Sequence, residues 1–424
     1  MINFLFRGLI RDKQRSLFPI IIVAAGVMMT TWLFSWMLGV FNEIIEGGAR
    51  FDTGHVKVTT RAYNEIASQM PNDLCLTEVH TLLNELDKDY PGYDWTPRIK
   101  FAGLADVPDE NGETRAQAPV MGFAVDLLSD HSIEDERLQI SKSIVRGSFP
   151  NSAGEIVISD ELAQKLEVGI GETITLISVS ANGGMAIHNF TLSGTVTFGM
   201  GALDRGAMIA DISDIQYALD MENATGEILG FKKNLVFDQE QAVSIKEEFN
   251  KKMSNTEDEY SPYMITLLDQ NGLGEYLVFA QAAGFLIVGI FVFAMSIVLW
   301  NTGLMSGIRR YGEVGIRLAM GETKSHIYKT MLVEAFLIGL MGSFIGTVIG
   351  VAGGYYFQEY GMDISGAFKN STMMVNDVVR AQVTFTSYYI GFIPGVLAML
   401  FGTAISGIGI FRRQTATLFK ELEV

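Results

Sequence analysis

This sequence is poor in the residues that build disulfides, metal clusters and phosphate-binding loops. Its 424 residues include a single cysteine, Cys75, so no disulfide can form within the chain. The five histidines are isolated, and none lies within five residues of another. The dipeptide Gly-Lys does not occur, which excludes the G-x-x-x-x-G-K-[ST] phosphate cradle. We therefore expect neither a histidine-based metal site nor a nucleotide site in this chain.

Signals of catalysis are missing as well. No G-x-S-x-G elbow is present. The acidic pairs Asp109-Glu110 and Asp258-Glu259 stand in polar, turn-like runs that are typical of solvated loops. The sequence thus predicts a non-catalytic chain with no catalytic residue, no bound cofactor and no metal.

Charged residues are absent from the middle of four long apolar runs. Each run reaches the ~20 residues that a helix needs to cross a hydrocarbon core of ~30 Å. One charged side chain at the centre of such a helix costs about 2.5–3.5 kcal/mol, and Glu275 and Glu334 fall in first turns. Four transmembrane helices without an internal ion path are predicted. They cover residues 17–41, 275–301, 331–357 and 385–411.

Basic residues in the short flanks predict the orientation, because cytoplasmic loops carry the excess of Lys and Arg. Such residues mark three segments as cytoplasmic, and we expect a large domain and a short loop outside the membrane. The first apolar run is too long for a cleaved leader and lacks a small-x-small site, so an uncleaved signal anchor is expected. The cytoplasmic segments are an amphipathic N-terminus at 1–16, the loop 302–330 and the tail 412–424; the external ones are 42–272 and 358–384.

The charge of the chain is concentrated in the external domain. Residues 42–272 contain 38 acidic and 17 basic side chains, a net charge of −21, whereas the rest of the chain carries +4. An acidic exterior argues against nucleic acid as a partner and against docking on anionic lipid headgroups. The simplest reading is a solvated surface that charge keeps soluble.

The external domain shows two kinds of pattern. Residues 50–103 and 229–270 each read as strand, helix and strand, with strands expected at 54–60, 97–101, 235–237 and 263–267. Two such units can pair into a split βαβ sheet with both helices on one face. Residues 104–228 between them read as a β-rich insert, in which Ser159 is the expected N-cap of a short helix. The predicted fold is therefore a four-helix (1+3) membrane protein with a large α+β extracytoplasmic domain.

Small residues give the third apolar run a distinct face. Gly342, Gly346 and Gly350 recur every fourth residue and Gly339 extends the row, which predicts a groove for close helix packing. The alternative is that this glycine face is a moving seam, a surface along which neighbouring helices slide. Pro394 predicts a kink in the fourth run.

The loop between the second and third runs contains a short segment of mixed character, residues 309–321. Apolar residues alternate with charges there, and Gly321 offers a helix stop. Such a helix either anchors the loop at the membrane interface or presents side chains to a soluble partner. The candidate contact residues are Arg309, Arg310, Glu313, Ile316, Arg317, Met320 and Gly321.

This segment and the run after it resemble a family signature. Arg310-x-x-Glu313-x-Gly315-Ile316-x-x-Ala319-x-Gly321, followed by Glu334-Ala335-Phe336-Leu337-Ile338-Gly339, is similar to the FtsX-like permeases of ABC transporters. Arg146-Gly147-x-Phe149-Pro150 and Gly169-x-Gly171-Glu172-Thr173 look like the MacB-type periplasmic core. The stretch from Gly194 to Asp214 resembles the lipoprotein-release members, whose layout is also the most similar.

The resemblance implies a mechanism called mechanotransmission. In this family an ATPase dimer closes on ATP and pushes a coupling helix, here 309–321, and stiff spans pass the movement to the exported domains of two permease chains. The split βαβ unit is called Porter and the β-rich insert Sabre. The resemblance implies a bacterial inner-membrane protein with both termini in the cytoplasm. Implied partners are a separate ATPase that holds ATP and Mg, a second permease chain, membrane lipid, and a lipoprotein with its periplasmic acceptor. Two alternatives stay open: MacB-like export of peptides, drugs or other amphiphiles, and FtsX-like signalling to a cell-wall enzyme.

Overall fold

The computed structural model describes residues 13–199, 201–233, 237–253, 258–270, 272–308, 311–363 and 378–412. The chain divides into two units. The helical unit contains 13–43, the described residues of 278–363, and 378–412; the α/β unit contains the described residues of 44–277. Arg309 and Arg310 lie outside the described residues. The predicted class, four long apolar helices and a large α+β domain, is confirmed.

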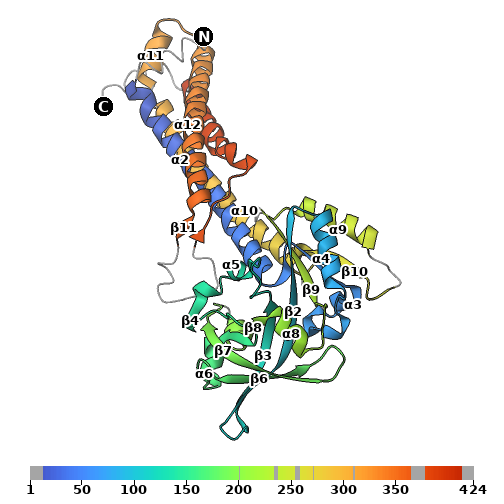
Figure 1. The fold of residues 1–424 in the computed structure, drawn as a ribbon. Coiled ribbons are helices and arrows are strands. Elements are labelled where there is room, and N and C mark those ends of the chain that lie inside the picture. The colour runs from blue at the N-terminus through green and yellow to red at the C-terminus, as the bar shows by residue number, and fades with distance from the viewer. Residues whose placement is uncertain are drawn as a thin grey trace. The chain divides into compact units, whose positions relative to one another are not determined.

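The helical unit follows the four apolar runs (Figure 1). The fourth run begins with a short 3-10 helix and a π-helix around Pro394, whose ring and missing N–H disturb regular helix there, before α13. A pair of two-residue strands joins the two ends of the loop between the third and fourth runs. The elements are α2 (Lys13–Gly48), α10 (Leu273–Ile308), α11 (Tyr311–Ala319), α12 (Lys324–Tyr360), β11 (Met362–Asp363), β12 (Val378–Val379), η7 (Phe385–Tyr388), η8 (Ile393–Ala398) and α13 (Met399–Arg412).

The α/β unit begins with a four-stranded layer of order β10-β1-β9-β2. Two helices cover one face of this layer, and their apolar side chains share one core cluster with Val56, Val58 and Met264 from the strands. This is the expected split βαβ arrangement. Its elements are β1 (Val56–Thr60), α3 (Arg61–Glu65), η2 (Ala67–Gln69), η3 (Asn72–Leu74), α4 (Val79–Asp89), β2 (Tyr93–Pro108), β9 (Glu227–Lys232), α9 (Gln239–Met253), β10 (Pro262–Thr266) and η5 (Leu267–Asp269).

One strand of this layer differs from the prediction. The strand before α9 was expected at 235–237, but 235 and 236 lie outside the described residues and Phe237 is not in a strand. The central strand is β9, which lies between β1 and β2. Neighbours on both sides and helices above leave β9 buried on both faces, so its residues do not show the alternation that marks a half-buried strand.

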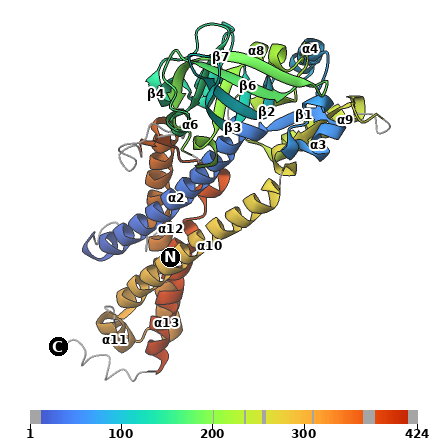
Figure 2. The ribbon, with the colours of Figure 1, turned by 90° about the horizontal axis from the view of Figure 1, so that it is seen from below.

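The β-rich insert closes into a barrel, which the sequence did not predict. Its strands pair in the circuit β2-β3-β8-β5-β7-β6 and back to β2. Closure leaves no free edge in this circuit. Figure 2 shows β2, β3, β6 and β7 side by side. The further elements are β3 (Thr114–Val125), α5 (Glu134–Leu138), η4 (Ser141–Ser143), β4 (Ile144–Gly147), β5 (Glu155–Ser159), α6 (Asp160–Lys165), β6 (Thr173–Val179), β7 (Met185–Val196), α7 (Gly201–Asp204), β8 (Ala207–Asp211) and α8 (Ile212–Ala218).

Strand β2 belongs to both parts of the α/β unit. Residues 93–98 pair with β9 of the four-stranded layer, and residues 99–108 pair with β3 of the barrel. The barrel is therefore joined to the layer by continuous strand rather than by a loop. Ser159 caps α6 as predicted, since its hydroxyl accepts the Leu162 N–H at 3.2 Å.

Candidate functional site

The segment between the second and third spans forms α11, a nine-residue helix. It ends where predicted: Gly321 has φ +93°, which a residue with a side chain rarely adopts. The N–H of Gly321 donates to the Leu318 carbonyl at 3.0 Å and the N–H of Glu322 to the Arg317 carbonyl at 3.1 Å, a Schellman ending. The chain can therefore turn sharply from α11 into α12.

One side of α11 packs inside the helical unit. Val314 is only 3% exposed and forms a small apolar cluster with Ile327 and Met331 of α12, against which Leu318 also packs. The Arg317 guanidinium binds Glu322 through two contacts, Nε to Oε2 at 2.7 Å and Nη2 to Oε1 at 3.0 Å. These contacts hold α11 to the start of α12, so that the two helices resist independent movement.

The other side of α11 leaves apolar side chains uncovered. Ile316 is 46% exposed and Met320, directly after the helix, is 75% exposed. Glu313 takes part in an interaction of its own. Of the seven predicted contact residues, the structure places five in one short helix and its turn, and the two arginines lie outside its description. What the arrangement offers is an apolar contact surface on a well-held helix.

The predicted glycine row on α12 faces α2 and η8. A Cβ atom built on Gly346 would lie 2.4 Å from the Ala24 carbonyl oxygen, and one on Gly350 would lie 3.0 Å from that of Met28. One on Gly342 would lie 2.7 Å from Val23. Gly339 meets the backbone of η8 instead, with the Gly395 carbonyl oxygen at 3.0 Å. The absence of side chains thus lets the backbones approach closely.

Two features of the α/β unit were not predicted. One is a group of exposed apolar side chains on the outer face of the barrel, where in-register neighbours share a face. Leu104 lies opposite Ile177 and Ile177 opposite Ile187, while Val179 lies opposite Met185. Met185 is 78% exposed. The alternation in β6 and β7 could have predicted that each strand has one buried and one exposed face. It could not have predicted that the exposed face is apolar.

The other is a set of buried charges where α2 enters the sheet. Lys57, Arg98, Glu134 and Glu227 are all under 6% exposed. They come from segments up to 170 residues apart, so no local pattern brings them together. Among the described residues, no group of three His, Cys, Asp or Glu side chains is placed to hold a metal ion.

Comparison with known proteins identifies the helical part. Residues 285–415 match the family FtsX-like permease C-terminal. The lipoprotein-releasing system transmembrane protein LolC of Haemophilus influenzae is 23% identical over 51% of this chain and 52% of its own length. LolC of Xylella fastidiosa is 20% identical over 68% of this chain and 70% of its own length. The macrolide export ATP-binding/permease protein MacB of Pasteurella multocida is 28% identical over 24% of this chain and 14% of its own length.

These matches confirm the expected resemblance. The chain carries an FtsX-like permease domain and is homologous to the LolC and MacB permeases. The alignment spans about half the length of the first of these relatives and a small part of MacB. The matched range contains α11, α12 and the glycine row.

Proposed function

We propose that this chain, a homologue of the LolC and MacB permeases, is the permease subunit of an ABC transporter. In this proposal a separate ATPase hydrolyses ATP, and the chain converts that event into movement of its α/β unit outside the membrane. The observation that carries the proposal is α11, an exposed apolar contact surface fixed to α12 within the permease match. The chain itself is non-catalytic.

The alternative that α11 merely anchors a loop has less support. An interfacial anchor needs a broad apolar face. Val314 and Leu318 are already packed against α12, and among the described side chains of this segment only Ile316 and Met320 remain as exposed large apolar groups. Two side chains are a small anchor but a sufficient hot spot for a protein contact. This favours a soluble partner.

Lipoproteins extracted from the inner membrane for delivery to the outer membrane are the proposed cargo. The LolC relatives and the exposed apolar residues on the barrel support an amphiphilic cargo, because a surface of that kind is typical of a binding site. MacB-like export of peptides, drugs or other amphiphiles is the second candidate, supported by the shorter MacB matches. FtsX-like signalling to a cell-wall enzyme is the third.

The proposed assembly contains two ATPase subunits, which hold ATP and Mg, and two permease chains, identical or different. It lies in a bacterial inner membrane with both termini in the cytoplasm and the α/β unit in the periplasm. Membrane lipid and a periplasmic acceptor of the cargo are further partners. No nucleic acid is involved, in keeping with the acidity of residues 42–272.

Isolation of the native complex tests this proposal. We expect affinity purification of the full chain in mild detergent to recover an ABC ATPase in amounts comparable to the permease, and ATPase activity with it. Mass spectrometry of the eluate identifies the cargo class: bound lipoprotein supports release, a membrane-fusion partner supports export, and a cell-wall hydrolase supports signalling. Recovery of the pure chain without any nucleotide-binding subunit would refute the motor-coupled function.

A reporter experiment tests the orientation separately. A periplasm-active phosphatase inserted after residue 110 or residue 182 should be active, because both positions lie in exposed turns of the barrel. The same reporter after residue 323, between α11 and α12, should be silent. A cytoplasm-active reporter at the three positions is the control and should give the opposite pattern. Activity of the phosphatase at 323 alone would invert the topology.

A further inference from the structure

The chain passes from α2 into the sheet through an unusual connector. α2 ends at Gly48 and a five-residue π-helix, η1 (Ala49–Thr53), follows it directly. The N–H of Gly54 donates to the Ala49 carbonyl at 2.9 Å, which closes the single turn. Single π-helical turns are rare and are frequently found at functional sites. With so few internal bonds, η1 alone would be a compliant joint between a long helix and a sheet.

Side chains from the sheet hold this connector by its backbone. Arg98 of β2 donates from Nη1 to the carbonyl oxygens of Arg50 at 2.6 Å and Phe51 at 3.1 Å. Its Nε donates to Glu134 at 2.9 Å, which fixes the guanidinium from the far side. Gln270, just after η5, donates to the Thr53 carbonyl at 3.1 Å and the Thr266 carbonyl at 3.2 Å. Three carbonyls of η1 therefore receive hydrogen bonds from other elements.

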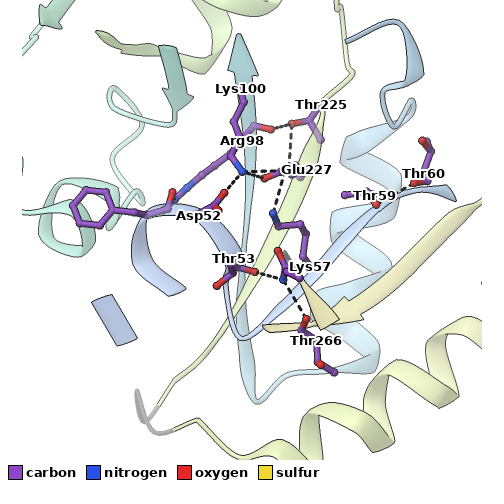
Figure 3. A network of polar contacts seen from close by, with 12 residues as sticks. Asp52, Thr53, Lys57, Thr59, Thr60, Arg98, Lys100, Thr225, Glu227 and Thr266 are labelled. Carbon is purple, nitrogen blue, oxygen red and sulfur yellow. Dashed lines mark hydrogen bonds and ion pairs between the residues drawn. The ribbon is translucent and has the colours of Figure 1, made fainter. Parts of the chain in front are cut away.

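The one acidic side chain of η1 is held as well. Asp52 pairs with Lys100 of β2, whose ammonium also contacts Glu227 at 3.1 Å (Figure 3). Lys57 of β1 reaches the same Glu227 carboxylate at 3.1 Å. Two lysines thus face two carboxylates, and the charges balance.

The pKa directions agree with this geometry. Burial by itself would lower the pKa of Lys100, but the carboxylates of Glu227 and Asp52 outweigh burial and raise it. Burial would raise the pKa of Asp52, yet Lys100 and Lys57 hold it below its ordinary value. Both groups are charged at neutral pH, so the ion pair between η1 and β2 is maintained.

A second link lies one turn earlier. The Nε2 of His55, in the turn into β1, is 2.9 Å from Glu46 in the last turns of α2. The Nδ1 of the same ring accepts the N–H of Lys232 in β9 at 2.9 Å. All three residues are buried or half-buried. α2 is thereby tied to the central strand of the layer as well as to β2.

Stability alone does not account for so many buried polar groups. Buried ion pairs contribute little net free energy compared with apolar packing, because desolvation offsets attraction. What hydrogen bonds and ion pairs add is direction, since each is satisfied in one geometry only. The contacts of Arg98, Lys100 and Gln270 converge on η1, whose few internal hydrogen bonds do not make it stiff.

We propose that Asp52, Arg98, Lys100 and Gln270 form a clamp that makes η1 rigid, so that displacement of α2 moves β1, β2 and β9 as one body. The proposal rests on the proposed function, because it assigns these residues a place in the transmission of movement. They are positioning residues and touch neither cargo nor ATPase. Without the clamp, η1 flexes and absorbs part of the displacement.

The test uses variants that leave Arg98 and Lys100 with their carboxylate partners Glu134 and Glu227. Asp52→Ala and Gln270→Ala are made singly and together in the full chain, reconstituted in nanodiscs with its ATPase. The matched control is Glu172→Ala: the Asp52 and Glu172 side chains are 44% and 47% exposed, and each forms one ion pair, with Lys100 and Arg115 respectively. Of these two ion pairs, only the one between Asp52 and Lys100 holds η1.

Two measurements are made on each variant. Hydrogen exchange of the Gly54 amide reports the opening of η1, and we expect it to rise about fivefold per lost contact, because one net hydrogen bond is worth about 1 kcal/mol. Fluorescence resonance energy transfer between labels at Asn182→Cys and Ser325→Cys, in a Cys75→Ala background, reports the change in the distance between the two labels from the nucleotide-free to the ATP-bound state. We expect its amplitude to fall in the double variant and to stay at the starting value in the control.

The outcomes separate the clamp from the function. If the unmodified chain shows no nucleotide-dependent change in transfer, the proposed function fails. If it shows a change that the double variant keeps in full, with ATP hydrolysis unaltered, the clamp proposal fails although the function stands. Unchanged exchange of the Gly54 amide would also overturn the clamp. Faster exchange with a smaller amplitude at unchanged hydrolysis supports it.

Discussion

The double replacement Ile316→Asp and Met320→Asp should release the ATPase from the complex. Both side chains are exposed, at 46% and 75%, so their loss removes little packing inside the chain. Buried in a contact with the ATPase, they would act as apolar hot spots, and two carboxylates in their place would have to be desolvated without partners. We expect the affinity for the ATPase to fall about 30-fold or more, since hot spots are worth about 2 kcal/mol or more.

The measurement is the amount of ATPase that co-purifies, together with its affinity for the reconstituted permease. Met185→Asp provides the control, because Met185 is 78% exposed and lies on the barrel, away from α11 in the sequence. It should keep the full amount of ATPase. Equal retention of the ATPase by the double variant and by the control would show that α11 is an anchor and not the point of contact.

Hydropathy and charge predicted the helical unit because each span is specified by its own composition. Four uncharged runs of sufficient length can be satisfied in a membrane only as helices. The ends were less predictable: α2 continues past residue 41 to Gly48, and among the residues after the apolar run Glu43 and Glu46 are good helix formers. The glycine row was readable since every fourth residue of a helix shares a face, and it does face other helices.

The α/β unit shows where local patterns stop being informative. Helix α4 is half-buried, so its helical spacing was visible. β1 is buried along its whole length, but its sequence still alternates between apolar and polar residues, and this made it readable. β9 is buried throughout and was misplaced. Barrel closure depends on the pairing of β2 with β6, whose residues are about 70 positions apart, and nothing local encodes such a pairing.

The buried charges around η1 were beyond sequence reasoning for a related reason. Lys57, Lys100 and Glu227 each look like ordinary surface residues of a strand, and only the order β1-β9-β2 brings them together. A single acidic or basic residue in a short strand predicts that its side chain is exposed. Such a side chain can be buried only when a residue of opposite charge lies beside it.

The replacement Gly346→Ala should weaken the contact between α2 and α12. Its Cβ would lie 2.4 Å from the Ala24 carbonyl oxygen and 2.8 Å from the Val27 Cβ atom, and both belong to a packed helix that can yield only by moving as a whole. Overpacking of this kind costs about 1–3 kcal/mol. We expect a lower melting temperature of the full chain in detergent, by several degrees.

The control for this prediction lies on the same helix. A Cβ on Gly353 would meet nothing closer than Trp32 at 3.9 Å, which is ordinary contact. Gly353→Ala should therefore leave the melting temperature unchanged, although both changes add one methyl group to α12. If the two variants have the same melting temperature, the glycine row is not a packing surface.

The same pair of variants decides between a fixed contact and a moving seam. A fixed contact needs the glycine only for its small size, so Gly346→Ala should lower stability while the ATP-dependent change in transfer between labels keeps its amplitude in the molecules that remain folded. A seam along which α2 slides must clear the carbonyls of Ala24 and Met28 in every cycle, so a methyl group at 346 would reduce that amplitude as well. The close approach at three successive glycines to the carbonyl oxygens of Ile20, Ala24 and Met28, which are one turn apart, favours a fixed contact. With α2 and α12 packed in this way and α11 held to α12, a push on α11 would be passed to α2, as the proposed function requires.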